Sequence, residues 1–228
     1  MKSLNMDPSV RVVLNTTEQD WEAAPAKGIW RKKLEREAAE SGLTTSIVRY
    51  DPQSNFPAHS HPMGEEIFVL DGVFSDESGD FPAGSYLRNP PGSSHSPSSL
   101  NGCIIFVKLN QFSNEDSAQL KLDTSSMEWQ PGLVEGLSVK PLHNFKYENV
   151  ALVRWAPNTF FKPHIHFGGE EILVLDGVFA DELGEYPAGT WIRSPHLSEH
   201  QPYSKQGCTI LVKTGHLADR GFLKNRPA

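Results

Sequence analysis

The chain contains two sets of residues that commonly bind metal ions. Each set has three histidines and one glutamate, in the same order and displaced by 105 positions: His59, His61, Glu65 and His95, then His164, His166, Glu170 and His200. Imidazole nitrogens and a carboxylate oxygen are ligands that divalent transition metals accept. The repetition predicts a duplicated chain with one divalent metal ion in each half.

The ligand types leave the identity of the metal open. Imidazole binds Zn, Fe, Mn, Ni and Cu alike. Four protein ligands are fewer than the six that octahedral Fe or Mn prefers, so water, dioxygen or a substrate could take the remaining positions. Such a site could therefore serve either sensing or catalysis.

Short strands must position these ligands. Side chains two residues apart on a strand point to the same face, so His59 and His61 can reach one ion. The segment 62–64 (Pro-Met-Gly) then bends the chain, and Glu65 opens a returning strand whose inward face carries the carboxylate. His95 arrives from a later strand.

A longer repeat surrounds both sets. Residues 47–108 align with 152–213 without a gap, and about half of the aligned positions are identical. We predict two domains, 1–115 and 116–228. Short strand-like segments alternate with Gly- and Pro-rich turns, which is typical of an all-β sandwich or barrel in each half.

Two local expectations accompany this pattern. The segment 70–73 (Leu-Asp-Gly-Val) predicts a hairpin, because Asp-Gly supplies the positive φ of a two-residue turn. The polar linker Ser113–Asp123 is expected to hold one short helix around Glu115–Leu120.

Two further repeated pairs have alternative roles. Glu66 and Glu171 face away from the inward row, where they could form ion pairs with Arg88 and Arg193. Alternatively, the two guanidinium groups lie beside the pocket and hold an anionic ligand.

The remaining cysteines and histidines carry weaker signals. Cys103 and Cys208 are also 105 positions apart, which favours one buried thiol per domain over a disulfide. A redox-sensing thiol beside the pocket is the alternative. His143, His196 and His216 have no repeat partner and are expected on the surface, with His196 near the rim of the second site.

Charge and hydropathy exclude several function classes. The formal net charge of −7 argues against a nucleic-acid partner, which would require a basic face. We see no signal peptide and no apolar run of the roughly 20 residues that a membrane span requires. We expect a cytoplasmic protein, and a homodimer because β-sandwich domains often pair through edges and faces.

The spacing of these residues resembles the cupins. His59-x-His61-x3-Glu65-x6-Gly72 is similar to the first cupin motif, and Gly84-x5-Pro90-x-Gly92-x2-His95 is similar to the second. The second half departs from the second motif only at Leu197, which replaces the glycine. More narrowly, the amino-acid sequence of segments 61–77 and 81–95 resembles the cupin domain of ChrR-type anti-sigma factors. The resemblance occurs twice, once in each half, and together the two copies cover nearly the whole chain.

This resemblance implies a double-stranded β-helix (jelly-roll) fold in each half. It implies a metal inside each barrel bound by the four residues of each set, and zinc as the favoured metal, with Fe, Mn and Ni as alternatives. ChrR-type regulators also carry an N-terminal helical zinc domain that grips the sigma factor. The roughly 46 residues before Ile47 contain no cysteine to build such a domain, so a sigma-factor partner is not expected.

Two functions follow from the resemblance and the ligands. The first is a zinc-loaded sensing or regulatory module that detects a small ligand or an oxidant. The alternative is a non-haem iron dioxygenase or a related oxidoreductase that acts on a small ketone-type substrate, as in similar single-cupin proteins. Fold alone does not choose between them, because one fold hosts many activities.

Overall fold

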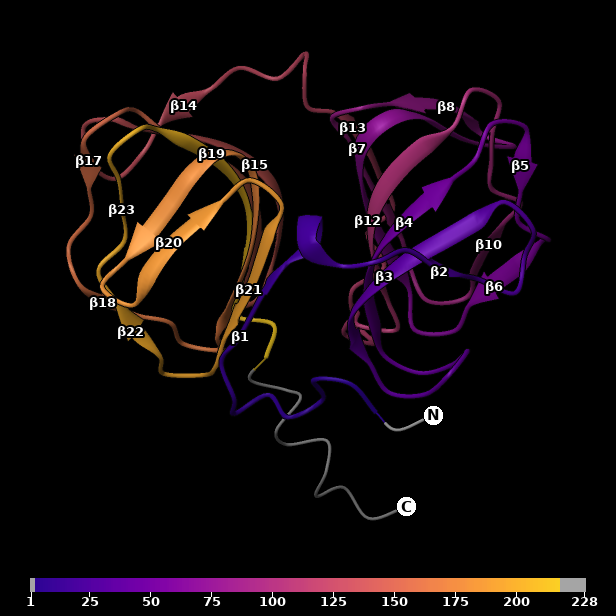
Figure 1. Ribbon diagram of the computed structural model, residues 1–228, viewed down its shortest axis with the longest axis horizontal. Helices are drawn as coiled ribbons and strands as arrows, with labels where there is room; N and C mark the ends of the chain where they lie inside the picture. The colour runs from indigo at the N-terminus through magenta and orange to yellow at the C-terminus, as the bar shows by residue number, and fades with distance from the viewer. Residues whose placement is uncertain (1–2, 218–228) are drawn as a thin grey trace. The chain divides into compact units, whose positions relative to one another are not determined.

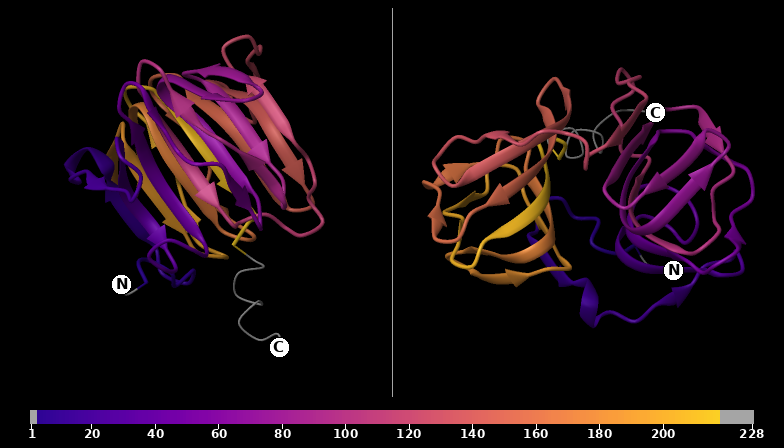
Figure 2. Two further views of the ribbon diagram at one scale, coloured as in Figure 1. Left: turned by 90° about the vertical axis from the view of Figure 1, so that its right-hand side faces the viewer. Right: turned by 90° about the horizontal axis from the view of Figure 1, so that it is seen from above.

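The computed structural model describes residues 3–217, which fall into two compact units. Within the described residues, unit 1 comprises 3–6 and 19–127, and unit 2 comprises 7–18 and 128–217. Each unit is a jelly-roll barrel of antiparallel strands (Figures 1 and 2).

Unit 1 is built from twelve strands. They are β2 (Glu22–Ala23), β3 (Ile29–Arg36), β4 (Thr44–Tyr50), β5 (Ser54–Asn55), β6 (His59–His61), β7 (Glu65–Asp76), β8 (Gly79–Pro82), β9 (Ser85–Asn89), β10 (Ser93–His95), β11 (Ser98–Ser99), β12 (Cys103–Leu109) and β13 (Leu120–Asp123). The main sheet has the order β13-β9-β7-β12-β4-β3-β2. The second half of β7 pairs with β8 and β11, and β6 pairs with β10.

Unit 2 repeats this topology. Its elements are β1 (Val12–Asn15), the 3-10 helix η1 (Thr16–Glu18), β14 (Gln130–Pro131), β15 (Leu137–Phe145), β16 (Glu148–Trp155), β17 (Thr159–Phe160), β18 (His164–Ile165), β19 (Glu170–Asp181), β20 (Gly184–Pro187), β21 (Thr190–Ser194), β22 (Glu199–His200), β23 (Tyr203–Ser204) and β24 (Cys208–Thr214). The main sheet has the order β1-β21-β19-β24-β16-β15-β14, strand for strand that of unit 1. The predicted duplication is therefore present in the fold.

The edge strands β1 and β13 do not follow a simple division of the chain. β1 precedes the whole of barrel 1 in sequence, yet it belongs to unit 2, where Val12 lies opposite Arg193. β13 follows barrel 1 and completes its sheet, with Leu120 opposite Arg88. The units therefore differ from the predicted division at 115/116, because backbone hydrogen bonds hold these strands to β21 and β9.

Two local predictions are wrong. β7 continues through Asp71 and Gly72, where a register shift against β12 marks a bulge and not a hairpin. Gly72 has a φ of 70°, and a Cβ there would lie 2.1 Å from the carbonyl oxygen of Gly102. The expected helix around 115–120 is absent, because 115–119 is irregular and Leu120 already begins β13.

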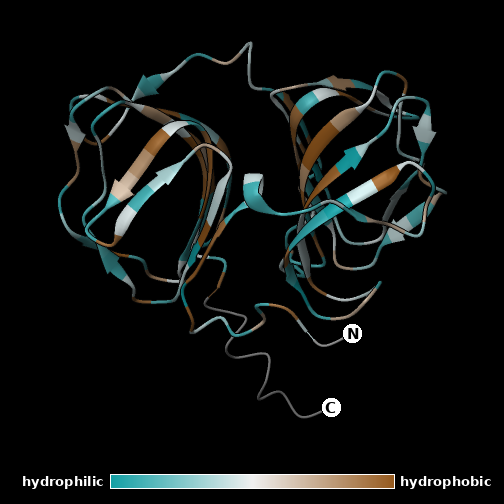
Figure 3. Ribbon diagram, in the orientation of Figure 1, coloured by the Kyte–Doolittle hydropathy of each residue, from teal (hydrophilic) through white to brown (hydrophobic). Residues whose placement is uncertain are grey.

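Each barrel encloses its own apolar core. Figure 3 shows apolar residues along the long strands and polar residues in most of the connecting loops. The central buried clusters consist of Ile29, Tyr50, Ile67, Val69, Phe74, Leu87, Cys103, Ile105 and Val107 in unit 1, and Trp155, Ile172, Val174, Phe179, Tyr186, Ile192, Cys208 and Ile210 in unit 2. Within the described residues, no helix has the length and apolar character needed to cross a membrane.

Candidate metal centres

The first ligand set converges at one end of barrel 1. His59 and His61 lie on β6, which pairs with β10 so that His95 is directly opposite His59. Glu65 begins β7, and its Oε2 lies 3.6 Å from Nε2 of His61 and 3.4 Å from Nε2 of His95. All four ligand atoms lie within 4.8 Å of one another. Neighbouring ligands on one ion, with bonds of about 2.1 Å, are separated by roughly 3.0–3.6 Å.

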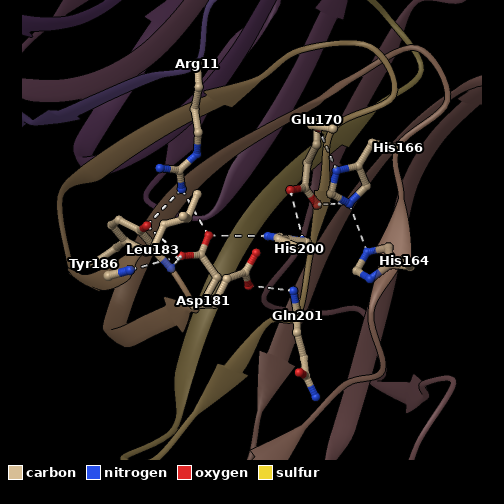
Figure 4. A network of polar contacts seen from close by, with 12 residues as sticks. Arg11, His164, His166, Glu170, Asp181, Leu183, Tyr186, His200 and Gln201 are labelled. Carbon is tan, nitrogen blue, oxygen red and sulfur yellow. Dashed lines mark hydrogen bonds and ion pairs between the residues drawn. The ribbon is translucent and has the colours of Figure 1, made fainter.

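The second set repeats this arrangement in barrel 2. His164 on β18 pairs with His200 on β22, and the Nε2 atoms of His164 and His166 are 2.9 Å apart. Glu170 places its carboxylate oxygens 3.5 Å from Nε2 of His166 and 3.6 Å from Nε2 of His200. In Figure 4 the Glu170 carboxylate points toward His166 and His200, with His164 beside them.

The surroundings prepare these side chains to bind a cation. Every ligand histidine has its Nδ1 near an oxygen, which favours the tautomer with a lone pair on Nε2. The partners are Pro57 O for His59 (2.9 Å), Ser93 Oγ for His61 (3.3 Å), Asp76 Oδ2 for His95 (3.4 Å), Lys162 O for His164 (3.1 Å), Ser198 Oγ for His166 (3.3 Å) and Asp181 Oδ2 for His200 (3.5 Å).

Several atoms that face the centre of each set are buried and have no hydrogen-bond partner among the described residues. They are Nε2 of His61, His95 and His200, and Oε2 of Glu170. Buried polar atoms are normally paired, so a group of unpaired ones that point together fits a cation. Both sets could therefore hold one divalent metal ion.

Burial shifts the protonation of the ligands. It lowers the pKa of His61 and His166 to about 3, and it raises the pKa of Glu65 and Glu170 to about 7. Both shifts disfavour the charged form of the free side chain. A bound cation would stabilise the carboxylate and would use the neutral imidazole directly.

The two centres are not identical. Asn89 donates a hydrogen bond of 3.0 Å to Oε2 of Glu65, whereas a serine, Ser194, occupies the matching position in barrel 2. Leu197 stands where the first motif has Gly92, and it keeps the left-handed backbone of that glycine, with a φ of 62°. The departure from the motif thus preserves the loop but adds an exposed apolar side chain.

The repeated arginines lie in buried polar contacts. Arg88 is fully buried and its Nη1 donates to Glu66 at 2.8 Å, as the ion-pair alternative predicts. Arg193 donates to the backbone oxygens of Asp7 and Val10. None of these contacts involves a metal ligand.

The expected surface position of His216 is wrong. Its side chain is buried, and its Nε2 lies 3.0 Å from Oε2 of Glu171. The rim position expected for His196 agrees with its contacts, since its Nδ1 accepts from the backbone N–H of Gly168 and its ring packs on Phe167.

Both cysteines are free thiols inside the barrels. Cys103 and Cys208 are buried, and burial raises the pKa of each thiol to about 11. Cys103 lies opposite Gly72 and Tyr50 in the sheet. Since the thiolate is the reactive form, neither residue has the character of an oxidant-sensing cysteine.

Sequence reasoning missed the residues that surround the ligands. Asp76 and Asp181 contact the third histidine of each set, and both recur within the repeated stretch. An aromatic wall also repeats. The ring centroids are 5.9 Å apart for Tyr50 and Phe74, 6.0 Å for Phe74 and His95, 5.7 Å for Trp155 and Phe179, and 6.2 Å for Phe179 and His200. The 105-residue offset was the available signal for both features.

Comparison with known families and structures gives a consistent picture. A family model described as the ChrR Cupin-like domain matches twice, over residues 9–113 and 117–218. A search of curated proteins gives no match.

Several solved structures share the fold at low sequence identity. A protein from Nostoc punctiforme that is provisionally described as a dioxygenase has a TM-score of 0.76 and 18% identity over 91% of this chain and 83% of its own. Protein Ylba from E. coli has a TM-score of 0.69 and 16% identity, covering 91% and 92%. Bacillus subtilis oxalate decarboxylase, which has Mn(II) centres, has a TM-score of 0.62 and 16% identity, covering 89% and 76%.

Proposed function

Since the chain belongs to the ChrR Cupin-like family, with two such domains, we propose that it is a metal-dependent oxidoreductase of the non-haem dioxygenase type. Its substrate would be a small ketone-type molecule that enters the barrel. The observation that carries this proposal is the set of unpaired, buried Nε2 atoms that point together beside an aromatic wall. The structural likeness to a provisionally described dioxygenase supports it.

The donor set fits such an ion. Three imidazoles and one carboxylate suit Fe(II) or Mn(II), and both ions prefer more than four ligands. When bound, the ion would supply Lewis-acid and redox chemistry to an oxygen-bearing substrate.

The chain's own residues orient and shield this chemistry. The outward Nδ1 contacts fix the imidazole rings, and Asn89 fixes the carboxylate of Glu65. Phe74 packs between Tyr50 and His95, so it keeps the inner face of the site apolar. An apolar wall excludes bulk water and strengthens polar contacts inside the barrel.

A second candidate is a zinc-loaded sensing or regulatory module. The family's description as ChrR Cupin-like favours it, and zinc accepts the same ligands. A thiol-based oxidant sensor has less support, since the pKa of both buried cysteines is raised to about 11. Detection of a small ligand at the metal itself remains part of this candidate.

Metal content tests the centres first. We expect wild-type protein to retain two divalent ions per chain, and His59→Ala and His164→Ala to retain one each. Ser60→Ala and Ile165→Ala are matched controls, because these exposed side chains alternate with the ligands on the same strands and should not change the metal content. Full metal retention in both histidine variants would contradict the two-centre assignment.

Oxygen uptake then separates the two candidates. Protein loaded anaerobically with Fe(II) should consume dioxygen when small diketones or hydroxy-ketones are added. The uptake should fall in the histidine variants and persist in the controls. Metal retention without uptake for any of these compounds would reject the dioxygenase and favour the sensing module.

A further inference from the structure

The second centre contains a charged network that reaches one of its ligands. Nη2 of Arg11 lies 3.0 Å from Oδ2 of Asp181 and donates to the Tyr186 hydroxyl at 2.8 Å. That hydroxyl donates in turn to Oδ1 of Asp181 at 2.7 Å, and Oδ2 of Asp181 lies 3.5 Å from Nδ1 of His200. Figure 4 shows Asp181 between the guanidinium and His200.

The network is well placed to act on the ligand. The Asp181 side chain is 1% exposed and that of Arg11 is 27% exposed, so the ion pair is largely shielded from solvent. A carboxylate that accepts from the outer nitrogen of a ligand histidine fixes the ring and raises its basicity as a donor. Arg11 and Tyr186 draw on the same carboxylate, so they reduce the negative charge available to His200.

The first centre lacks this device. Oδ2 of Asp76 lies 3.4 Å from Nδ1 of His95, and its Oδ1 accepts hydrogen bonds from Ser78 instead of from an arginine or a tyrosine. Phe81 occupies the position that matches Tyr186 in the repeat. The strand registers, with Val12 opposite Arg193 and Leu120 opposite Arg88, place the neutral Gln119 at the position that matches Arg11.

The charges around the two centres therefore differ. Around the first centre, the negative charges of Asp76 and Glu77 interact electrostatically with His95. Around the second centre, the negative charges of Asp181 and Glu182 interact electrostatically with His200. Two positive charges are also present there: Arg11 interacts with Glu170, and Lys162 interacts with His164. The residues that match these two cations in the first half are Gln119 and Pro57, which are both neutral. With the same divalent ion in both halves, the second centre carries the more positive surroundings.

We propose that Arg11, acting through Asp181, adapts the second metal centre to hold a small anionic ligand, such as a carboxylate, on its ion. The first centre then favours a neutral ligand. Arg11 is a positioning residue in this account, since it touches Asp181 and not the ion. The proposal rests on the metal-dependent function above, and it assigns the two halves different ligand classes.

Azide binding to Co(II) tests this difference. His59→Ala leaves the second centre and His164→Ala leaves the first, so each protein reports one centre through the visible absorption of Co(II). Azide should bind more tightly in the protein that retains the second centre. There, Arg11→Met should weaken azide binding by about tenfold, the lower end of the range for loss of groups outside the metal ligands, because Arg11 acts through Asp181. Arg11→Lys should restore part of the affinity.

Two further variants guard against simple misfolding. Tyr186→Phe keeps the ring and removes one hydroxyl, and it should weaken azide binding in the same direction with an unchanged circular dichroism spectrum. Gln119→Leu in the protein that retains the first centre is the matched control and should leave azide binding unchanged.

The outcomes distinguish failure of the metal centres from failure of the role of Arg11. Failure of Co(II) to bind in either parent protein would overturn the metal centres and this role of Arg11 together. Normal Co(II) spectra with the same azide affinity in Arg11→Met, Tyr186→Phe and the parent would overturn the role of Arg11 alone. Equal azide affinity of the two parent centres would also overturn it.

Discussion

The buried carboxyl group of Glu65 should make metal binding at the first centre sensitive to acid. Its pKa is raised to about 7 by burial, and a divalent ion requires the carboxylate form. Below that pH, metal binding must displace a proton, so the apparent affinity falls by up to about tenfold per pH unit. His61 adds no such loss until strongly acidic conditions, because burial lowers its pKa to about 3.

The magnitude follows from this pKa. Acidification from about pH 8 to about pH 5.5 leaves roughly 3% of the Glu65 carboxyl groups ionised, so the affinity should fall by ~30-fold, or ~2 kcal/mol. Titration of the His164→Ala protein with Co(II), against a competing chelator, measures this at the first centre alone. Glu65→Gln should bind the ion more weakly at about pH 8 but lose less affinity on acidification. An equal pH dependence in Glu65→Gln and its parent would refute the reasoning.

Folding of the metal-free protein should depend on pH in the opposite direction. Burial raises the pKa of Glu65 from its ordinary value of 4.5 to about 7, so between these two pH values the folded state keeps a proton that the unfolded chain has lost. The stability from this group is therefore fully present below 4.5 and is lost as the pH rises through 7. Urea unfolding with and without metal at both ends of this range measures the reversal.

Three further predictions concern stability and reactivity. Arg88→Met should lower the free energy of unfolding by ~3–5 kcal/mol in urea denaturation, because it removes the buried guanidinium that pairs with the carboxylates of Glu66 and Asp116; Lys205→Met, in an exposed ion pair, should change it little. Leu197→Gly should raise the free energy of unfolding by about 0.5–1 kcal/mol, since glycine accepts the φ of 62° without strain; a loss of stability in the same measurement would contradict this. Both cysteines should react with iodoacetamide at about pH 8 only after unfolding, as buried thiols with a pKa of about 11 are protonated there; fast labelling of folded protein would contradict it.

The ligand residues could be predicted because their spacing is local. His59 and His61 occupy alternate positions of one strand, and Glu65 follows one bend later, so periodicity alone places them together. The identical strand order of the two main sheets confirms the tandem all-β fold. Zinc, homodimerisation and a cytoplasmic location stay predictions.

Features that depend on long-range pairing could not be predicted. The polar segment after residue 113 has turn-forming residues, and only the exposed edge of β9 makes Leu120–Asp123 a strand. The positive φ that an Asp-Gly pair favours suits both a hairpin turn and a bulge. The pair lies in a bulge here because β7 continues to pair with β12 on both sides of the register shift. Arg11 reaches Asp181 only because β1 pairs with β21, which no local pattern indicates.

The placement of β1 has a consequence for synthesis of the chain on the ribosome. β1 is synthesised before the whole of barrel 1, but its partner β21 is synthesised after it. A nascent chain therefore carries an edge strand with unsatisfied backbone groups while barrel 1 forms, and such edges invite pairing with other chains. The same strand order determines suitable boundaries for expressing one barrel alone. A fragment that ends at 115 would lack β13, and one that starts at 116 would lack β1 and Arg11. A shortened chain in which β1 is joined to β14, with barrel 1 deleted, would keep every strand of the second barrel.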